Sequence, residues 1–185
     1  MIDSSSISHI QDVQEGIIGK DKLLQNLHDG SALILKGRSS PVAVGKDLMV
    51  KVNTSIGLGL ESGLDRELRK VTKISSLGYK PDLMMDLSIR KTPTPIYKCI
   101  IEKIGCPVGT LPHYLCYSPT SGINPQDLLD EIAHQAKEGV SFMTLHVTPR
   151  KSLYELAKRV RNTPCTSRGG GIVTHDMYIN NREES

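Results

Sequence analysis

Polar side chains that could bind a small molecule follow short apolar runs along the 185-residue chain. Asn53 comes near the end of the run 48–55, and its amide can both donate and accept a hydrogen bond. Asp86 and Ser88 end the run 82–88, where a carboxylate could hold a hydroxyl group or an arginine. Asn53 could instead cap a loop, and Asp86 could tie loops together. The residues alone leave both roles open.

Two histidines occupy similar positions later in the chain. His113 and Tyr114 follow the run 106–112, and His146 lies at the polar end of the long run 140–147. An imidazole can bind a ligand or transfer a proton near neutral pH. A lone histidine on an apolar strand is more often a satisfied core residue. The position of His146 at the polar end keeps a functional role open beside the structural one.

The segment 167–171, Ser-Arg-Gly-Gly-Gly, offers a different chemistry. An arginine guanidinium and unhindered backbone N–H groups both complement a phosphate. A plain surface turn is the alternative. The chain contains neither a Walker motif nor a G-x-G-x-x-G fingerprint, so any phosphate site here is of another kind.

The elements that must position these residues can be read from the apolar pattern. We predict strands over 48–55, 82–88, 106–112 and 140–147, and a strand end running into a glycine loop over 165–174. The helices predicted between them span 62–78, 94–105, 124–139 and 150–162. Before residue 48 we predict a frayed, polar terminus or one short helix over 1–17, a helix over 20–30, a strand over 31–37 and a turn-rich connection over 38–45.

This alternation implies parallel strands joined by helical crossovers, and so an α/β fold. A doubly wound sheet and a (β/α)8 barrel both fit the spacing. Functional groups at successive strand ends are typical of a barrel. Because we count five strands and a full barrel has eight, we expect an incomplete barrel over 48–185. An N-terminal extension with a helix–strand element over 1–47 precedes it.

Composition excludes other classes of protein. The net charge is +3, so we expect no nucleic-acid partner. The longest apolar runs are far shorter than the roughly 20 residues that span a bilayer, and no signal peptide is visible, so we expect no membrane partner. The four cysteines form no Cys-x-x-Cys pair. We expect reduced thiols in a cytoplasmic protein, with a zinc or iron–sulfur site as the alternative.

Five segments in order resemble one known family. They are KVNTSIG (51–57), MMDLS (84–88), PVGTLPHY (107–114), GVSFMTLHV (139–147) and SRGGG (167–171). Together they are similar to the 4-amino-5-hydroxymethyl-2-methylpyrimidine phosphate synthases, the ThiC family of thiamine biosynthesis. The stretch from residue 23 to 53 also resembles this family, in which a helix and a strand precede the barrel.

The resemblance implies a (β/α)8 barrel and a radical S-adenosylmethionine reaction that uses a [4Fe–4S] cluster and a divalent metal, zinc. The implied small-molecule substrate is 5-aminoimidazole ribonucleotide, which becomes hydroxymethylpyrimidine phosphate. A close sub-family makes 5-hydroxybenzimidazole from the same substrate. Carried over by motif, the substrate-binding residues are Asn53, Met85, Tyr114, His146, Ser167, Arg168 and Gly169.

The chain departs from the family pattern in two respects. The loop 89–95, IRKTPTP, stands where the family has a glycine-rich loop. The family's cysteine motif and paired histidines are not among these residues, so we expect no ligands for the cluster or the metal and no activity of this chain alone. A second copy or a complementing chain would cover the open sheet edges. A non-catalytic nucleotide-binding remnant and a generic phosphate-binding α/β protein are the alternatives.

Overall fold

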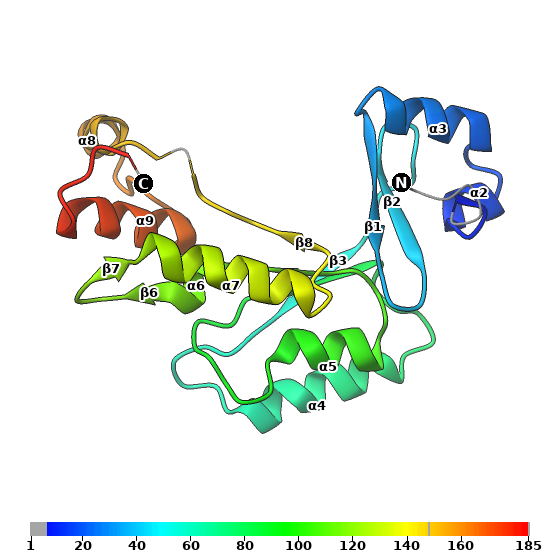
Figure 1. The fold of residues 1–185 in the computed structure, drawn as a ribbon, viewed down its shortest axis with the longest axis horizontal. Helices are drawn as coiled ribbons and strands as arrows, with labels where there is room; N and C mark the ends of the chain where they lie inside the picture. Colours follow the sequence, from blue (N-terminus) through cyan, green and yellow to red (C-terminus); the bar gives the residue numbers. More distant parts are fainter. Residues whose placement is uncertain (1–6, 148, 185) are drawn as a thin grey trace.

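A four-stranded parallel sheet lies at the centre of the molecule (Figure 1). The computed structural model describes residues 7–147 and 149–184. The strands lie in the order β3-β4-β5-β8, with the bounds Asn53–Ile56, Leu83–Asp86, Val108–Thr110 and Phe142–Met143. Their parallel pairing confirms the α/β character predicted for the chain after residue 48.

Two helices cover one face of this sheet. The helix α4 (Leu64–Ser75) connects β3 to β4, and α5 (Ile96–Lys103) connects β4 to β5. Both helices lie on the same side of the strands (Figure 1). The core between helices and sheet includes four side chains with no exposed surface, namely Val71, Met84, Ile100 and Val108. Burial of this apolar surface holds the two crossovers against the sheet.

A row of residues on the opposite face remains partly open. Ser55, Met85, Gly109 and Phe142 pair with one another across the four strands. Because successive side chains alternate between the two faces of a sheet, this row faces away from α4 and α5. Ser55 is exposed, and Met85 and Phe142 are half-buried. The ring of Phe142 occupies the space that a Cβ at position 109 would need, which explains the glycine there.

The N-terminal residues form a second apolar cluster. It comprises α2 (Gln11–Gln14), α3 (Lys20–His28) and an antiparallel hairpin of β1 (Ala32–Lys36) and β2 (Pro41–Gly45). The side chains of Ile10, Leu23 and Ala43 are buried in it. Figure 1 shows these elements, in blue, at one end of the central sheet.

A buried ion pair joins this cluster to the start of the sheet. Nζ of Lys51 lies 2.8 Å from Oδ2 of Asp12, and the two side chains are 6% and 1% exposed. The backbone N–H of Met49 also donates to Asp12, over 2.7 Å. The carboxylate of Asp12 is therefore fully used in fixing the segment that leads into β3.

Two predictions for the first half of the chain are wrong. The segment 38–45, expected to be a turn-rich connection, contains β2. Pro41 begins that strand, a position where the missing N–H of proline is tolerated. The strand expected over 48–55 begins only at Asn53, because N–H groups of the preceding residues donate to side chains. The N–H of Val52, for example, donates to Asp82 over 2.7 Å, while its carbonyl oxygen accepts from Leu83 at the start of β4. Asn53 therefore begins its strand rather than ending it.

The prediction for residues 165–174 is also wrong. After α8 (Lys151–Val160), which matches the predicted helix, the chain forms no strand near 165 among the described residues and instead enters α9 (Arg168–Ile179). Ser167 caps this helix, because its Oγ accepts a hydrogen bond from the N–H of Gly170 at 3.0 Å. Val173 and Met177 are buried. Their packing stabilises a helix whose glycines disfavour it.

The region between β5 and α7 contains elements that the apolar pattern did not predict. They are α6 (Pro112–Cys116) and an antiparallel pair of short strands, β6 (Tyr117–Ser118) and β7 (Gly122–Ile123). The following helix α7 (Pro125–Lys137) was predicted, and Asn124 caps it by accepting from the N–H of Gln126 at 2.9 Å.

The described part of the chain thus contains four parallel strands where five were expected. These strands form an open sheet, and residues 7–147 and 149–184 do not close into a barrel. Within the same residues, no helix is both long enough and apolar enough to cross a bilayer.

Candidate functional site

Asp86, the last residue of β4, is buried and fully hydrogen-bonded. Its carboxylate accepts from the N–H and hydroxyl of Ser88, at 2.9 and 2.5 Å, and from the N–H of Tyr97 at 2.9 Å. Burial raises the pKa of Asp86, although these hydrogen bonds act in the opposite direction. Ser88 in turn accepts from the N–H of Leu58 at 3.0 Å. Of the two roles left open for Asp86, the geometry supports the tying of loops.

Thr110, at the end of the neighbouring strand β5, begins a chain of hydrogen bonds. Its hydroxyl donates to Oε1 of Gln135 at 2.5 Å, and the Gln135 amide donates to Glu131 at 2.8 Å. The ammonium of Lys91 bonds the other oxygen of Glu131 at 2.7 Å. Although burial raises the pKa of Glu131, the hydrogen bonds from Lys91 and Gln135 lower it below its usual value. This series of hydrogen bonds links β5, α7 and the loop 89–95.

Three segments meet beyond the ends of β5 and β8 in what we call the imidazole cluster, composed of His113, Tyr114, His146 and Gly169. The ring centroids of His113 and His146 lie 5.2 Å apart, and those of His113 and Tyr114 lie 4.8 Å apart, both edge to face. A Cβ at position 169 would overlap His146 Nε2 and would lie 2.9 Å from His113 Nε2. Only glycine therefore allows the first turn of α9 to approach both rings.

His113 is the most buried polar side chain of this cluster, at 2% exposure. Neither of its ring nitrogens has a hydrogen-bond partner among the described residues. Burial, assisted by the nearby His146, lowers the pKa of His113 to about 4. The His113 imidazole is therefore neutral at physiological pH, with one donor and one acceptor unused.

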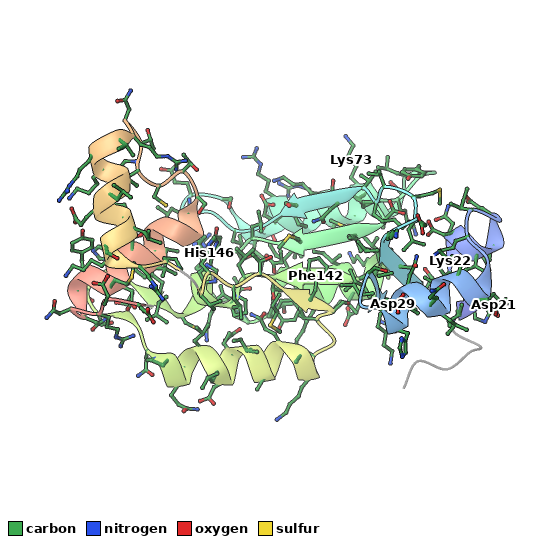
Figure 2. All side chains as sticks on the ribbon, turned by 90° about the horizontal axis from the view of Figure 1, so that it is seen from above. Asp21, Lys22, Asp29, Lys73, Phe142 and His146 are labelled. Carbon is green, nitrogen blue, oxygen red and sulfur yellow. The ribbon has the colours of Figure 1, made fainter. Side chains whose placement is uncertain are left out.

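The structure brings together most, but not all, of the seven residues carried over by motif. Tyr114 and His146 are half-buried in the imidazole cluster with Gly169, while Ser167 and Arg168 are exposed at the start of α9. Figure 2 shows Phe142 in β8 and His146 on the segment that leads from β8 to α8. Met85 lies on the open face of the sheet.

Asn53 stands apart from the others. It is exposed at the beginning of β3, whereas the imidazole cluster lies beyond the opposite, carboxyl ends of the strands. Sequence reasoning noted His113 but did not include it among the binding residues. Its position directly before Tyr114 in the PVGTLPHY segment was the available signal.

A large cavity lies elsewhere, and none of the seven residues lines it. It has a volume of about 540 Å³ and lies between α7 and the loop 89–95. Arg90 and Lys91 from the loop and Asp127, Glu131 and His134 from α7 contribute to its wall. The loop 89–95 therefore forms one side of this cavity.

The described residues do not fit an iron–sulfur cluster or a metal ion. All four cysteines are half-buried free thiols. Burial raises the pKa of Cys99, Cys106 and Cys116, that of Cys106 to about 11, which disfavours the thiolate that a cluster needs. No three His, Cys, Asp or Glu side chains within 7–147 and 149–184 converge as metal ligands.

Comparison with known proteins identifies relatives along nearly the whole chain. The model of the Radical SAM ThiC family matches residues 4–185. The phosphomethylpyrimidine synthase of Sulfurisphaera tokodaii is 35% identical over 179 residues, which are 90% of this chain and 41% of the relative. The enzymes of the same name from Clostridium tetani and Pyrobaculum aerophilum are 33% and 32% identical, over 92% and 90% of this chain and 39% and 41% of theirs. The chain spans about two-fifths of the length of these relatives.

Proposed function

Because the chain belongs to the radical SAM ThiC family, we propose that it provides substrate-binding residues of a phosphomethylpyrimidine synthase in thiamine pyrimidine biosynthesis. The proposed substrate is 5-aminoimidazole ribonucleotide, and the proposed product is hydroxymethylpyrimidine phosphate. The family's name implies an iron–sulfur cluster and S-adenosylmethionine, which supply the radical chemistry. We assign to the described residues the binding and orientation of the substrate.

One observation carries this proposal: three of the five family-like segments meet in the imidazole cluster. Tyr114, His146 and Gly169 come from segments that are well separated in the sequence, yet Gly169 lies against His146 and against the neighbour of Tyr114. A site made of residues from several loops at the carboxyl ends of parallel strands is the usual arrangement in α/β enzymes.

The start of α9 is the proposed phosphate site. The first N–H groups of a helix have no partner within the helix, and the helix dipole favours an anion there. Ser167 uses its hydroxyl to cap the N–H of Gly170, while Arg168 is exposed at the first helical position. Because the N–H groups of Gly170 and Gly171 both donate to Ser167, the donors proposed for the phosphate are the Arg168 guanidinium and the first N–H groups of α9.

The test of the proposed function is the binding of 5-aminoimidazole ribonucleotide, measured by calorimetry on the 185-residue chain. We expect a dissociation constant on the order of 0.1–1 mM, since part of the site is provided by residues outside those described. The Arg168→Ala variant should bind about tenfold more weakly or worse, because it loses a charge-assisted hydrogen bond to phosphate.

The matched control is Arg90→Ala. Arg90 is also exposed, but it lies in the loop 89–95 and donates to the backbone oxygen of Ser62. Its replacement should change the affinity for the ribonucleotide much less. Equal affinities of the wild type and the Arg168→Ala variant would remove the phosphate site from α9.

A further inference from the structure

His113 is a buried side chain whose ring nitrogens form no hydrogen bond with the described residues around it. The side chain is 2% exposed, and neither Nδ1 nor Nε2 has a hydrogen-bond partner among the described residues. Buried polar atoms normally have such partners, and leaving them without one is unfavourable. This imidazole is therefore complementary to a group that the described residues do not provide.

The surroundings limit what that group can be. His113 and His146 line a cavity of about 130 Å³, and six of the ten residues in its wall are apolar. The charged residues of the wall, Asp176 and Arg182, face each other at 3.5 Å, and Asp176 also accepts from the N–H of Ile123 at 2.7 Å. No uncommitted charge in the described wall favours a charged ligand, so the ligand should be small and neutral.

The two rings define the shape and the hydrogen bonding of the ligand. A neutral imidazole offers one N–H donor and one acceptor nitrogen in the plane of the ring. The edge-to-face arrangement of His113 and His146 suits a third flat ring beside them. We propose that His113, with His146, recognises an uncharged nitrogen heterocycle that carries both a hydrogen-bond donor and an acceptor. His113 thereby becomes a specificity-determining residue of the site.

This inference rests on the proposed function for the identity of the ring, since the aminoimidazole of the proposed substrate has these properties. It also assigns a role to Gly169. A Cβ at position 169 would lie 2.9 Å from Nε2 of His113, so the glycine keeps the space beside this nitrogen free of a side chain.

The experiment follows the Cε1–H resonances of the histidines by NMR in the full 185-residue chain. Two probes separate the heterocycle from the phosphate: 5-aminoimidazole-4-carboxamide, which has no phosphate, and ribose 5-phosphate, which has no heterocycle. We expect the carboxamide to shift the His113 resonance and ribose 5-phosphate to leave it unchanged. The variant His113→Phe keeps a flat ring but removes both nitrogens, so it should bind the carboxamide about tenfold more weakly.

Two further variants test whether weaker binding by His113→Phe comes from a general loss of structure. His113→Gln keeps a donor and an acceptor and should recover much of the affinity that His113→Phe loses. His28→Phe, at an exposed position of α3, is the control and should bind like the wild type. If His113→Phe does not fold, the resonance shift in the wild type and the affinity of His113→Gln still decide the question.

The outcomes separate this inference from the proposed function. A His113 resonance that no heterocycle shifts, or that ribose 5-phosphate shifts equally, would overturn the inference. If the ribonucleotide nevertheless binds in a way that depends on Arg168, the proposed function stands without it. If the carboxamide binds at His113 but the ribonucleotide binds no more tightly, the inference stands and the proposed substrate is wrong.

Discussion

At the scale of single residues, Gly169 determines how closely α9 approaches the two histidines. A Cβ at this position would overlap Nε2 of His146 and would crowd Nε2 of His113. The absence of a side chain is therefore what allows the imidazole cluster to form. The family-like segment SRGGG contains two more glycines, whose surroundings differ, and this difference permits a controlled comparison.

We predict that Gly169→Ala lowers the free energy of unfolding by about 1–3 kcal/mol, because the methyl group forces α9 away from the rings. Gly171→Ala is the control in the same helix turn, since nothing lies within 4 Å of a Cβ built there. Alanine favours a helix over glycine, so this variant should be neutral or up to about 1 kcal/mol more stable. Urea unfolding measures both; equal effects of the two substitutions would contradict the packing described.

A second prediction at this scale concerns pH. The pKa of His113 is lowered to about 4 in the folded chain, from 6.5 when exposed. Between these values the unfolded chain binds more protons at this position, so the free energy of unfolding falls as the pH falls from 6.5 to 4. The loss should approach about 3 kcal/mol. Urea unfolding at several pH values should show this slope in the wild type and lack it in His113→Gln, with His28→Gln as the control.

The site could be predicted from sequence only in part. The chemistry of Tyr114, His146 and the segment 167–171 was visible from residue types and from the resemblance. Asn53 was predicted near the end of its strand but begins it. The N–H groups of Met49 and Val52, which the apolar pattern placed in the strand, donate instead to the side chains of Asp12 and Asp82. The importance of His113 depends on burial without partners, a property that no local pattern contains.

At the scale of elements, the sequence pattern predicted the helices α3, α4, α5, α7 and α8. Asn124, Pro125 and Gly139 bound α7 correctly to within two residues. The helix α9 was missed because three of its first four residues are glycines, and its stability comes from distant contacts of Val173 and Met177. The short elements α6, β6 and β7 are too brief to show a period in the sequence.

We predict that Asn124→Ala lowers the free energy of unfolding by about 1 kcal/mol, within the range measured for helix caps. Oδ1 of Asn124 accepts from the N–H groups of Gln126 at 2.9 Å and Asp127 at 3.4 Å, and alanine leaves both donors without this partner. Asn124→Asp keeps the acceptor and should recover most of the stability. Thermal unfolding followed by circular dichroism measures the three proteins; an alanine variant as stable as the wild type would exclude the cap as a contributor.

At the scale of the whole molecule, the two apolar clusters depend on a few polar links between them. The pair of Lys51 and Asp12 is the most deeply buried of these, and it lies where the chain enters β3. Ser141, just before β8, adds a second link, because its hydroxyl donates to the backbone oxygen of Lys36 in β1 at 2.6 Å. The position of the N-terminal elements is therefore coupled to the geometry of the sheet.

We predict that Asp12→Ala lowers the free energy of unfolding by about 3–5 kcal/mol, because it leaves the ammonium of Lys51 buried without its partner. Glu155→Ala breaks the exposed pair with Lys158 in α8 and is the control. It should cost less than about 1 kcal/mol. Urea unfolding distinguishes the two, and a small effect of Asp12→Ala would mean that water reaches Lys51.

The ring of Phe142 has a practical consequence for studying the open face of the sheet. It lies across Gly109, half-buried, on β8 at the end of the strand row, and it is the single phenylalanine in the chain. Biosynthetic labelling with fluorophenylalanine would therefore introduce one fluorine signal, at this site and at no other. Any molecule or protein segment that covers the face would change the surroundings of that fluorine. The chain thus carries a natural single-position reporter on the surface that its strands leave uncovered.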